Sequence, residues 1–189
     1  QHFTSKLALD IDGLGEKIID LLVDQKHLLS ISDIYLLDQD KLKTLEGFGE
    51  RSAKKLISAI HKSKTTSFSK FVYGLGVRNV GEYISKLLEK HFLGDLEKLM
   101  NSSEQELESI EGVGPIAARE IIMFFSIDLN KTIIKECFSR GLAIKDYAFI
   151  KNEFLSDKTF VFTGSLNTIT QKEGKEIVSK FGGNSSNSI

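Results

Sequence analysis

Nonpolar residues recur with helical spacing through most of the chain. Two stretches repeat the i, i+3, i+4, i+7 pattern that places nonpolar side chains on one helix face, so we expect helices there. These stretches carry Ala53, Leu56, Ile57 and Ile60, and Ala118, Ile121, Ile122 and Phe125. A similar stripe begins at Ile84, Leu87 and Leu88. The sequence Ser103-Glu104-Gln105-Glu106 is a capping box, which predicts a short helix running to about Ser109.

The pattern changes towards the C-terminus. Helical spacing is lost over residues 141–156. Residues 158–163 are then rich in β-branched and aromatic side chains, which is typical of a strand. Thr163-Gly164-Ser165 is interpreted as the loop that leaves this strand, and a helix is expected over residues 171–181. A new domain is therefore expected to begin near residue 157.

One short motif occurs four times in the helical part of the chain. It consists of a nonpolar residue, a spacer and then Gly-nonpolar-Gly, with a helix expected directly after it. The copies are Ile11-Asp12-Gly13-Leu14-Gly15, Leu45-Glu46-Gly47-Phe48-Gly49, Val77-Arg78-Asn79-Val80-Gly81 and Ile110-Glu111-Gly112-Val113-Gly114. The helices that follow should begin at Glu16, Glu50, Glu82 and Pro115. Asn79 replaces a glycine, and asparagine tolerates a left-handed backbone best among the other residues, so a conformational role is indicated.

The repeat predicts the domain organisation. The last glycines of the four copies are 34, 32 and 33 residues apart, and a pair of hairpins used twice is the simplest account. We expect a first helix-hairpin-helix pair at 1–65, a second pair at 66–140, a linker at 141–156 and the start of another domain at 157–189. The fold class is therefore mainly α, with four helix-hairpin-helix motifs in two pairs, followed by a truncated α/β segment. Ankyrin and tetratricopeptide arrays have a similar period, but their Thr-Pro-Leu-His and Trp signatures are missing.

Composition excludes several classes of protein. With 41% nonpolar residues in 189, the chain can form a core and is not a disordered protein. The 25 Lys and Arg balance 26 Asp and Glu, so a polyanion would be held by local geometry and not by a general positive field. The single cysteine favours a reducing cytosol. There is no run of 18 nonpolar residues and no signal peptide, and the absence of an initiator Met suggests a piece of a longer protein.

The glycine turns are candidate phosphate sites. A tight turn before a helix leaves main-chain amides unpaired at the positive end of the helix dipole, which favours anions. The middle residue of each turn is expected to point inward as an anchor, and nearby cations would add to each site. The predicted DNA-binding residues are Gly13, Leu14, Gly15 and Lys17; Gly47, Phe48, Gly49, Arg51, Lys54 and Lys55; Arg78, Asn79, Val80 and Gly81; and Gly112, Val113, Gly114 and Arg119. Valine at Gly49 or Gly114 is expected to damage the turn and binding together.

Structural interpretations of the same residues remain open. A Gly-nonpolar-Gly sequence before a helix is often only a turn, and Asn79 makes the third copy the expected exception among the four. The stretch 51–64 contains five Lys or Arg and no acid, but these residues also suit an ordinary solvated helix face. Cys137 is interpreted as a small buried side chain and not as a nucleophile. The histidines at positions 2, 27, 61 and 91 have no catalytic partner in the sequence.

Two patterns that suggest an enzymatic or metal site fail on inspection. Asp10-Ile11-Asp12-Gly13 resembles the start of a calcium loop, but the twelfth position is Leu21, where a bidentate Glu is needed. The same residues resemble a Lys-x-Asp-Gly nucleotidyl-transfer motif, but Asp10 stands in place of the lysine. No catalytic residue and no metal site is predicted in this chain.

The motifs resemble those of a known family. Three stretches are similar to the C-terminal half of bacterial NAD-dependent DNA ligases. They are His2-Phe3 through Asp10-Ile11-Asp12-Gly13-Leu14-Gly15-Glu16-Lys17-Ile18-Ile19-Asp20, Phe71-Val72-Tyr73-Gly74-Leu75-Gly76-Val77-Arg78-Asn79-Val80-Gly81-Glu82, and Lys158-Thr159-Phe160-Val161-Phe162-Thr163-Gly164-Ser165-Leu166. The resemblance implies a helix-hairpin-helix domain that grips double-stranded DNA around a nick, without sequence specificity, followed by the truncated start of a BRCT domain.

The resemblance also implies what lies outside the chain. The parent protein would seal nicks in DNA replication and repair in the bacterial cytoplasm, at the nucleoid, using NAD, Mg and a structural Zn. Its adenylation, OB-fold and zinc-finger domains would precede Gln1, so this fragment is expected to bind no cofactor and to be inactive alone. No membrane contact is expected. A different hypothesis is a stand-alone DNA-repair binding or scaffolding module of the excision-nuclease or Holliday-junction type.

Overall fold

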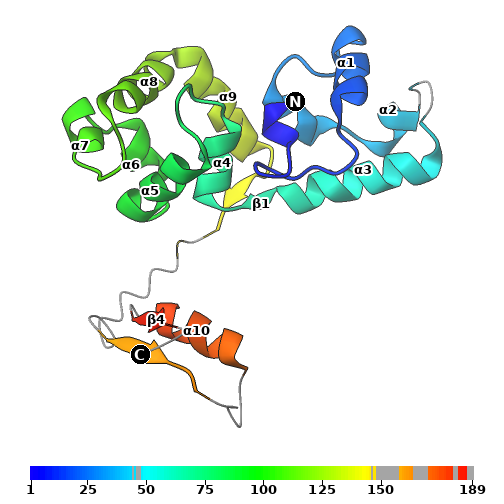
Figure 1. The fold of residues 1–189 in the computed structure, drawn as a ribbon. Coiled ribbons are helices and arrows are strands. Elements are labelled where there is room, and N and C mark those ends of the chain that lie inside the picture. The colour runs from blue at the N-terminus through cyan, green and yellow to red at the C-terminus, as the bar shows by residue number, and fades with distance from the viewer. Residues whose placement is uncertain are drawn as a thin grey trace. The chain divides into compact units, whose positions relative to one another are not determined.

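The structure, a computed structural model, describes residues 1–43, 45, 48–145, 147, 158–163, 170–180 and 183–186. Contacts divide the chain into two units, residues 1–147 and residues 148–189 (Figure 1). The first unit contains all four glycine turns, and the second contains the expected strand and helix near the C-terminus.

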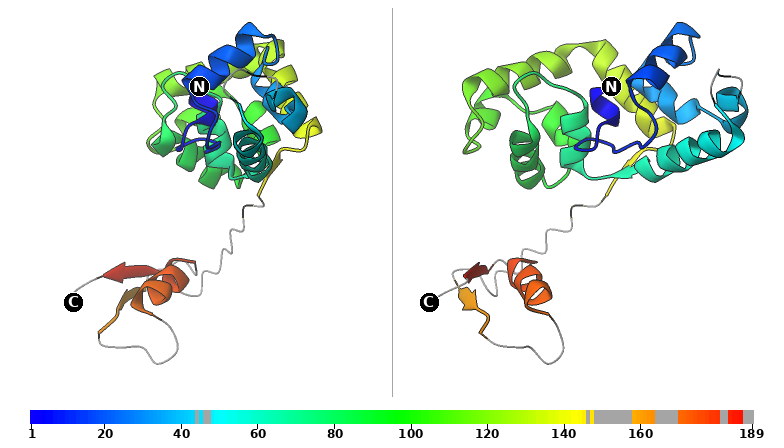
Figure 2. Two further views of the ribbon diagram at one scale, coloured as in Figure 1. Left: turned by 90° about the vertical axis from the view of Figure 1, so that its right-hand side faces the viewer. Right: turned by 45° about the vertical axis from the view of Figure 1, so that its right-hand side comes forward.

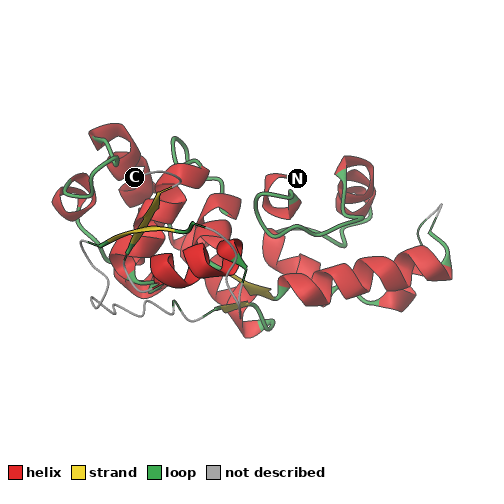
Figure 3. Cartoon of the chain, turned by 60° about the horizontal axis from the view of Figure 1, so that its bottom comes forward, coloured by secondary structure: helices red, strands yellow, loops and turns green. Residues whose placement is uncertain are grey.

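The described part of the first unit is mainly helical (Figure 3). Its helices are the 3₁₀-helices η1 (His2–Thr4) and η2 (Ile31–Leu36), and α1 (Glu16–Asp24), α2 (Gln39–Lys43), α3 (Glu50–Ser63), α4 (Phe68–Gly74), α5 (Glu82–Phe92), α6 (Leu96–Met100), α7 (Glu104–Glu108), α8 (Pro115–Ser126) and α9 (Asp128–Ser139). Two short strands, β1 (Thr65–Thr66) and β2 (Ala143–Ile144), pair in parallel. The helices expected from nonpolar spacing and from the capping box are confirmed.

The helices on either side of a glycine turn pack against each other. Helices α2 and α3 flank the second turn, α4 and α5 the third, and α7 and α8 the fourth, and each of these pairs is in contact. The first turn differs, because the short helix η1 precedes it in place of an α-helix. In Figures 1 and 2, α1–α3 lie at one end of the unit and α5–α8 at the other, with α4 and α9 between them.

A continuous nonpolar core joins the two halves of this unit. Helix η1 packs against α4, and η2 packs against α9. Gly74 lies at the first of these contacts, where a Cβ would approach Cδ2 of Leu9 to 2.9 Å. The largest fully buried side chains come from both halves and include Leu14, Leu22, Leu42, Leu56, Phe68, Phe71, Leu88, Leu99, Leu107 and Ile121. The core therefore fixes one hairpin pair against the other.

The predicted linker is wrong at its N-terminal end. Leu142 is buried, and Ala143 and Ile144 form β2, which lies beside Thr65 and Thr66 of β1. The amide of Ala143 donates to the carbonyl of Lys64 at 2.6 Å, and that of Lys145 donates to the carbonyl of Thr66 at 2.8 Å. A two-residue strand whose partner is far away in the sequence leaves no periodic pattern. Residues 148–157, the rest of the expected linker and the start of the next domain, lie outside the described residues.

The second unit contains a β-α-β arrangement. Strand β3 (Thr159–Val161) pairs in parallel with β4 (Asn184–Ser186), and α10 (Gln171–Lys180) lies between them in sequence. The expected strand and helix are confirmed, but β4 was not expected because Asn-Ser-Ser has no nonpolar alternation. Thr170 caps α10: its hydroxyl oxygen accepts from the amide of Glu173 at 3.2 Å, and its amide donates to that carboxylate at 2.7 Å. Gly164 and Ser165 of the expected loop lie outside the described residues.

Candidate nucleic-acid interface

The four glycine turns share one hydrogen bond. In each turn the amide of the middle nonpolar residue donates to the carbonyl of the residue three positions earlier. The pairs are Leu14 to Ile11 at 3.1 Å, Phe48 to Leu45 at 3.1 Å, Val80 to Val77 at 3.1 Å and Val113 to Ile110 at 2.9 Å. The repeat found in the sequence is therefore a repeat of backbone structure.

The residue before the middle position has a left-handed backbone in each of the three turns where it is described. Its φ is +90° at Gly13, +60° at Asn79 and +93° at Gly112, whereas Gly47 lies outside the described residues. Side chains rarely adopt this conformation, and asparagine is the usual exception. The conformational role predicted for Asn79 is confirmed, and its turn has the same backbone as the glycine turns.

The middle residues anchor the turns in the core. Leu14, Val80 and Val113 are 2%, 5% and 5% exposed, and Phe48 is half-buried. The inward orientation expected of these residues is confirmed for the three buried side chains. Because those side chains are covered, a ligand at the turn would meet only their main-chain atoms.

The second glycine of each motif begins a helix in extended backbone. Gly15, Gly49, Gly81 and Gly114 have φ of −82°, −88°, −82° and −81°, and no side chain caps the helix that follows. Their carbonyls accept from the residue four positions later, at 3.0 Å in each case. The helices start at Glu16, Glu50, Glu82 and Pro115, as predicted. The amides at the start of a helix have no i−4 partner and point out of its N-terminus, although in α1 the amide of Ile18 donates to the carbonyl of Gly15 at 3.1 Å and in α8 Pro115 has no amide to offer.

Other helices of the chain are capped by side chains. The first-turn amides of five helices donate to a side-chain oxygen of the preceding residue, which satisfies one of the open donors. These capping residues are Asp38 before α2, Ser67 before α4, Asp95 before α6, Ser103 before α7 and Thr170 before α10. Helix α9 follows Ile127 directly and also lacks a side-chain cap. Glycine in place of a cap is thus a property of the four hairpins.

Neither conformation nor packing explains the second glycines. A Cβ built on Gly15, Gly49, Gly81 or Gly114 would have no described atom within 4 Å. By contrast, a Cβ on Gly112 would lie 2.8 Å from Cδ1 of Leu87. Open space at Cβ and an ordinary φ do not test the damage expected of valine at Gly49 or Gly114, which stays a prediction because valine is disfavoured at a helix N-cap. What the glycines leave is an uncovered group of amides, which is suited to an anion.

Most of the predicted cations are free to reach an anion. Lys17, Arg51, Lys54 and Arg78 are exposed, and none of them makes an ion pair with another described residue. Two others are engaged. Lys55 Nζ lies 2.7 Å from Oδ2 of Asp12 in the first turn, and Arg119 Nε lies 3.5 Å from Oε1 of Glu104.

The ion pair at the first turn affects the acid as well as the base. The hydrogen bond and the charge of Lys55 hold the pKa of Asp12 below its ordinary value. Asp12 is therefore charged at neutral pH, and it lies beside the amides of its turn. Phosphate binding at this turn would require Lys55 to turn from Asp12 towards the ligand.

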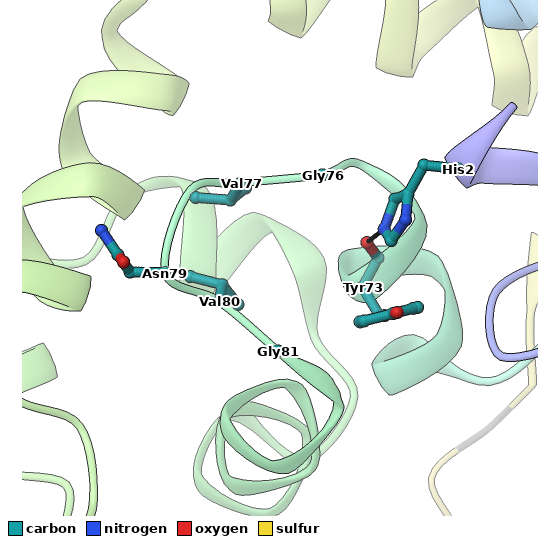
Figure 4. A pocket seen from close by; sticks show the side chains of 7 residues that line it. All are labelled: His2, Tyr73, Gly76, Val77, Asn79, Val80 and Gly81. Atoms are coloured by element: carbon teal, nitrogen blue, oxygen red, sulfur yellow. Dashed lines mark hydrogen bonds between the residues drawn. The ribbon is translucent and has the colours of Figure 1, made fainter.

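The third turn has the most favourable charge of those described. Its second residue is Arg78, whereas Asp12 and Glu111 occupy the same position in the first and fourth turns. A hollow of about 550 Å³ opens beside it, lined by the turn, Tyr73 and His2 (Figure 4). His2 donates from Nε2 to the carbonyl of Tyr73 at 2.8 Å. His2 begins one of the stretches that carry the family resemblance, but the sequence indicated no role for it, because its place beside the third turn depends on the packing of η1 against α4.

Two further exposed residues near the turns, Tyr83 and Ile116, were not singled out from the sequence. Lys17 and Arg51 are the second residues of their helices, and the same position holds Tyr83 in α5 and Ile116 in α8. Tyr83 and Ile116 are each 68% exposed. The register of the repeat could have identified them, but a search for cations passes over nonpolar residues.

Other types of site find no support among the described residues. None of their His, Cys, Asp and Glu side chains form a group of three or more that could hold a metal ion. Cys137 is buried, and burial raises the pKa of its thiol to about 12, so its interpretation as a packed nonpolar side chain is confirmed. No helix in the described ranges is both long and nonpolar enough to cross a membrane.

Each hairpin pair matches a helix-hairpin-helix family in a comparison with known proteins. Residues 5–62 match the family described as "SAM-like Helix-hairpin-helix tandem", and residues 70–134 match "Helix-hairpin-helix motif". The two matched ranges fall within the two predicted pairs, at 1–65 and 66–140.

The whole chain is also similar to bacterial DNA ligases. It is 37% identical over 190 residues to the DNA ligase of Methylococcus capsulatus, 39% over 189 residues to that of Syntrophus aciditrophicus and 35% over 192 residues to that of Syntrophobacter fumaroxidans. Each alignment covers 100% of this chain and 28% of the relative. The resemblance inferred from the motifs is confirmed, and the chain spans little more than a quarter of the length of these relatives.

Proposed function

Taking the similarity of the whole chain to part of bacterial DNA ligases as the premise, we propose that this segment binds duplex DNA through its backbone phosphates. The observation that carries the proposal is the environment of Gly15, Gly49, Gly81 and Gly114. Each begins a helix, has an extended backbone and has open space where a side chain would lie. Neither a positive φ nor a close contact requires glycine there; glycine is tolerated as an N-cap, and without a side chain it leaves room for close approach of a sugar-phosphate backbone.

The distribution of charge supports local binding of phosphates at the turns and not a protein surface that attracts any polyanion. The chain has a net charge of −1, so long-range attraction is weak. Four cations that make no ion pair with described residues, Lys17, Arg51, Lys54 and Arg78, lie close in sequence to three of the turns. Contacts to phosphate carry no base information, so binding is independent of sequence.

We extend the proposal to the protein of which this segment is part. That protein seals nicks in duplex DNA with NAD as the adenylyl donor, acts in replication and repair, and works at the nucleoid in the bacterial cytoplasm. Its Mg, NAD and structural Zn bind in adenylation, OB-fold and zinc-finger domains outside this chain. The residues present do not fit those groups: Asp10 stands where an adenylation lysine would be needed, and the described residues contain no metal-binding cluster.

The second unit is proposed to be the start of a BRCT domain. The parallel β3-α10-β4 arrangement agrees with an α/β fold, and the alignment with ligases continues through it. That same continuity favours a ligase segment over a stand-alone repair or scaffolding module.

Titration with a nicked duplex tests DNA binding. We expect a Kd of about 10⁻⁴ to 10⁻⁶ M at physiological salt and a slope of log K against log salt of about −4 to −7, if each hairpin covers one or two phosphates. Amide resonances of the four turns should shift during the titration. A slope near zero, or unshifted turn amides, would contradict the proposal.

Matched variants separate binding from folding. Threonine is about as favourable as glycine at the start of a helix, so Gly49→Thr and Gly114→Thr should retain the thermal midpoint while covering the open amides. We expect each to weaken DNA binding by about ten-fold, the effect of losing one charge-assisted hydrogen bond. The control is the reverse change, Ser103→Gly, at a helix that a side chain caps. It should lower the thermal midpoint slightly and leave DNA binding unchanged.

A further inference from the structure

The second residue of each hairpin helix has a different chemistry in the two halves of the unit. Lys17 and Arg51 occupy this position in α1 and α3, and Tyr83 and Ile116 occupy it in α5 and α8. All four are exposed. A single exposed nonpolar residue needs no explanation. Two at the same position of a repeat, each next to an open group of amides, do require one.

Tyr83 also lies against a neighbouring turn. A Cβ placed on Gly112 would be 3.3 Å from Cε1 and 3.4 Å from the hydroxyl oxygen of Tyr83. The ring is therefore beside the fourth turn as well as at the start of the helix that follows the third. Despite these contacts it stays 68% exposed, which leaves most of its surface available to a ligand.

The position of these residues suggests what they contact. A phosphate held by first-turn amides lies beside the second residue of the helix, and a cation there can reach the phosphate oxygens. Tyrosine and isoleucine cannot pair with a charge. On a nucleic acid, the group adjacent to each phosphate is a deoxyribose, whose C–H faces are nonpolar.

We propose that the second helix residue contacts the duplex by a different force in each hairpin pair: Lys17 and Arg51 contact phosphates, whereas Tyr83 and Ile116 pack against deoxyribose. This inference rests on the proposed DNA binding and adds two residues to it. It divides the contribution of these four residues into a part that falls with salt, supplied by Lys17 and Arg51, and a part that does not, supplied by Tyr83 and Ile116.

The salt dependence of duplex binding by the full chain distinguishes the two contributions. For Tyr83→Ala and Ile116→Ala, we expect a loss of about three- to ten-fold at every salt concentration with the slope unchanged. For Lys17→Ala and Arg51→Ala, the magnitude of the slope should fall by about 0.9 for each phosphate that is no longer neutralised. Tyr83→Phe keeps the ring and should bind as the original chain does.

One control tests whether loss of any exposed nonpolar side chain weakens binding. Met123→Ala removes an exposed nonpolar side chain from the same helix as Ile116, about two turns away, and should not change binding.

The possible failures can be told apart. If the unaltered chain binds DNA but Tyr83→Ala and Ile116→Ala bind equally well, the inference is wrong while DNA binding stands, and the exposed pair is a surface for another protein domain. A changed slope for these two variants also overturns it. If the unaltered chain does not bind duplex at all, DNA binding itself fails, and this inference fails with it.

Discussion

At the scale of single residues, the two glycine positions of the motif have different roles, and Asn79 takes the first position in the third copy. The first glycine, where it is described, has a positive φ that the turn requires, and the second has an ordinary φ and open surroundings. The glycine turns and the conformational role of Asn79 could be predicted from the sequence, because the backbone freedom of a residue is a local property. The sequence did not separate the two roles, because they depend on the surroundings of each glycine in three dimensions.

This difference predicts opposite effects on stability within one turn. Gly112→Ala forces a side chain into a backbone with φ of +93° and should lower the free energy of unfolding by about 1–2 kcal/mol. Gly114→Thr should leave it almost unchanged, because its φ is −81°. Urea denaturation of the two variants would measure this. Equal stability loss in both would mean that the two positions are constrained alike.

At the scale of elements, a polar cluster joins η2 to α9. Arg140 donates to Oδ1 of Asp33 and to Oγ of Ser32, each at 2.7 Å, and Ser32 donates to Glu136 at 2.7 Å. The side chains of Arg140 and Asp33 are only 21% and 19% exposed. Because η2 belongs to the first hairpin pair and α9 to the second, the cluster holds the pairs together.

Breaking this cluster should destabilise the first unit strongly. Arg140→Met leaves two partly buried carboxylates without their cation, and we expect a loss of about 2–4 kcal/mol in the free energy of unfolding. Lys98→Met is the matched control, because it removes an exposed ion pair with Asp95 and should cost less than about 1 kcal/mol. Chemical denaturation would show the contrast, and similar losses for both would contradict it.

The same cluster predicts a loss of stability in acid. Partial burial raises the pKa of Asp33, but the amides of Leu29 and Ser30 and the charge of Arg140 outweigh it, so the pKa lies below its ordinary value. The unfolded chain therefore binds the proton first as the pH falls below about 4. Stability from this group is present above that pH and is lost as the pH falls through the folded pKa. Asp33→Asn should be less stable at pH 7 and should show a smaller acid-dependent loss in urea denaturation between about pH 6 and pH 3.

The sequence predicted these elements unevenly. The starts of α1, α3, α5 and α8 follow from Gly-Glu and Gly-Pro steps, and the start of α7 from its capping box, because these signals are local. Strands β2 and β4 were missed because each is only two or three residues long and depends on a distant partner. The contact between Ser32 and Arg140 joins residues 108 positions apart, and no local pattern indicates it.

At the scale of the molecule, the chain is expected to bind DNA without sealing it. It covers 28% of the length of the ligases it resembles, and its one partial match to a Lys-x-Asp-Gly motif, Asp10-Ile11-Asp12-Gly13, lacks the lysine. Incubation with nicked duplex, NAD and Mg should give no sealed product and no adenylated protein, as measured by gel electrophoresis and mass spectrometry. Formation of either product would show that the chain contains an active site that the motifs do not reveal.

Strands β1 and β2 bring the beginning and the end of the second hairpin pair together. Thr66 pairs with Ile144, so the second hairpin pair begins and ends at neighbouring positions. The two ends of the second hairpin pair are thus joined by main-chain hydrogen bonds as well as by the chain between them.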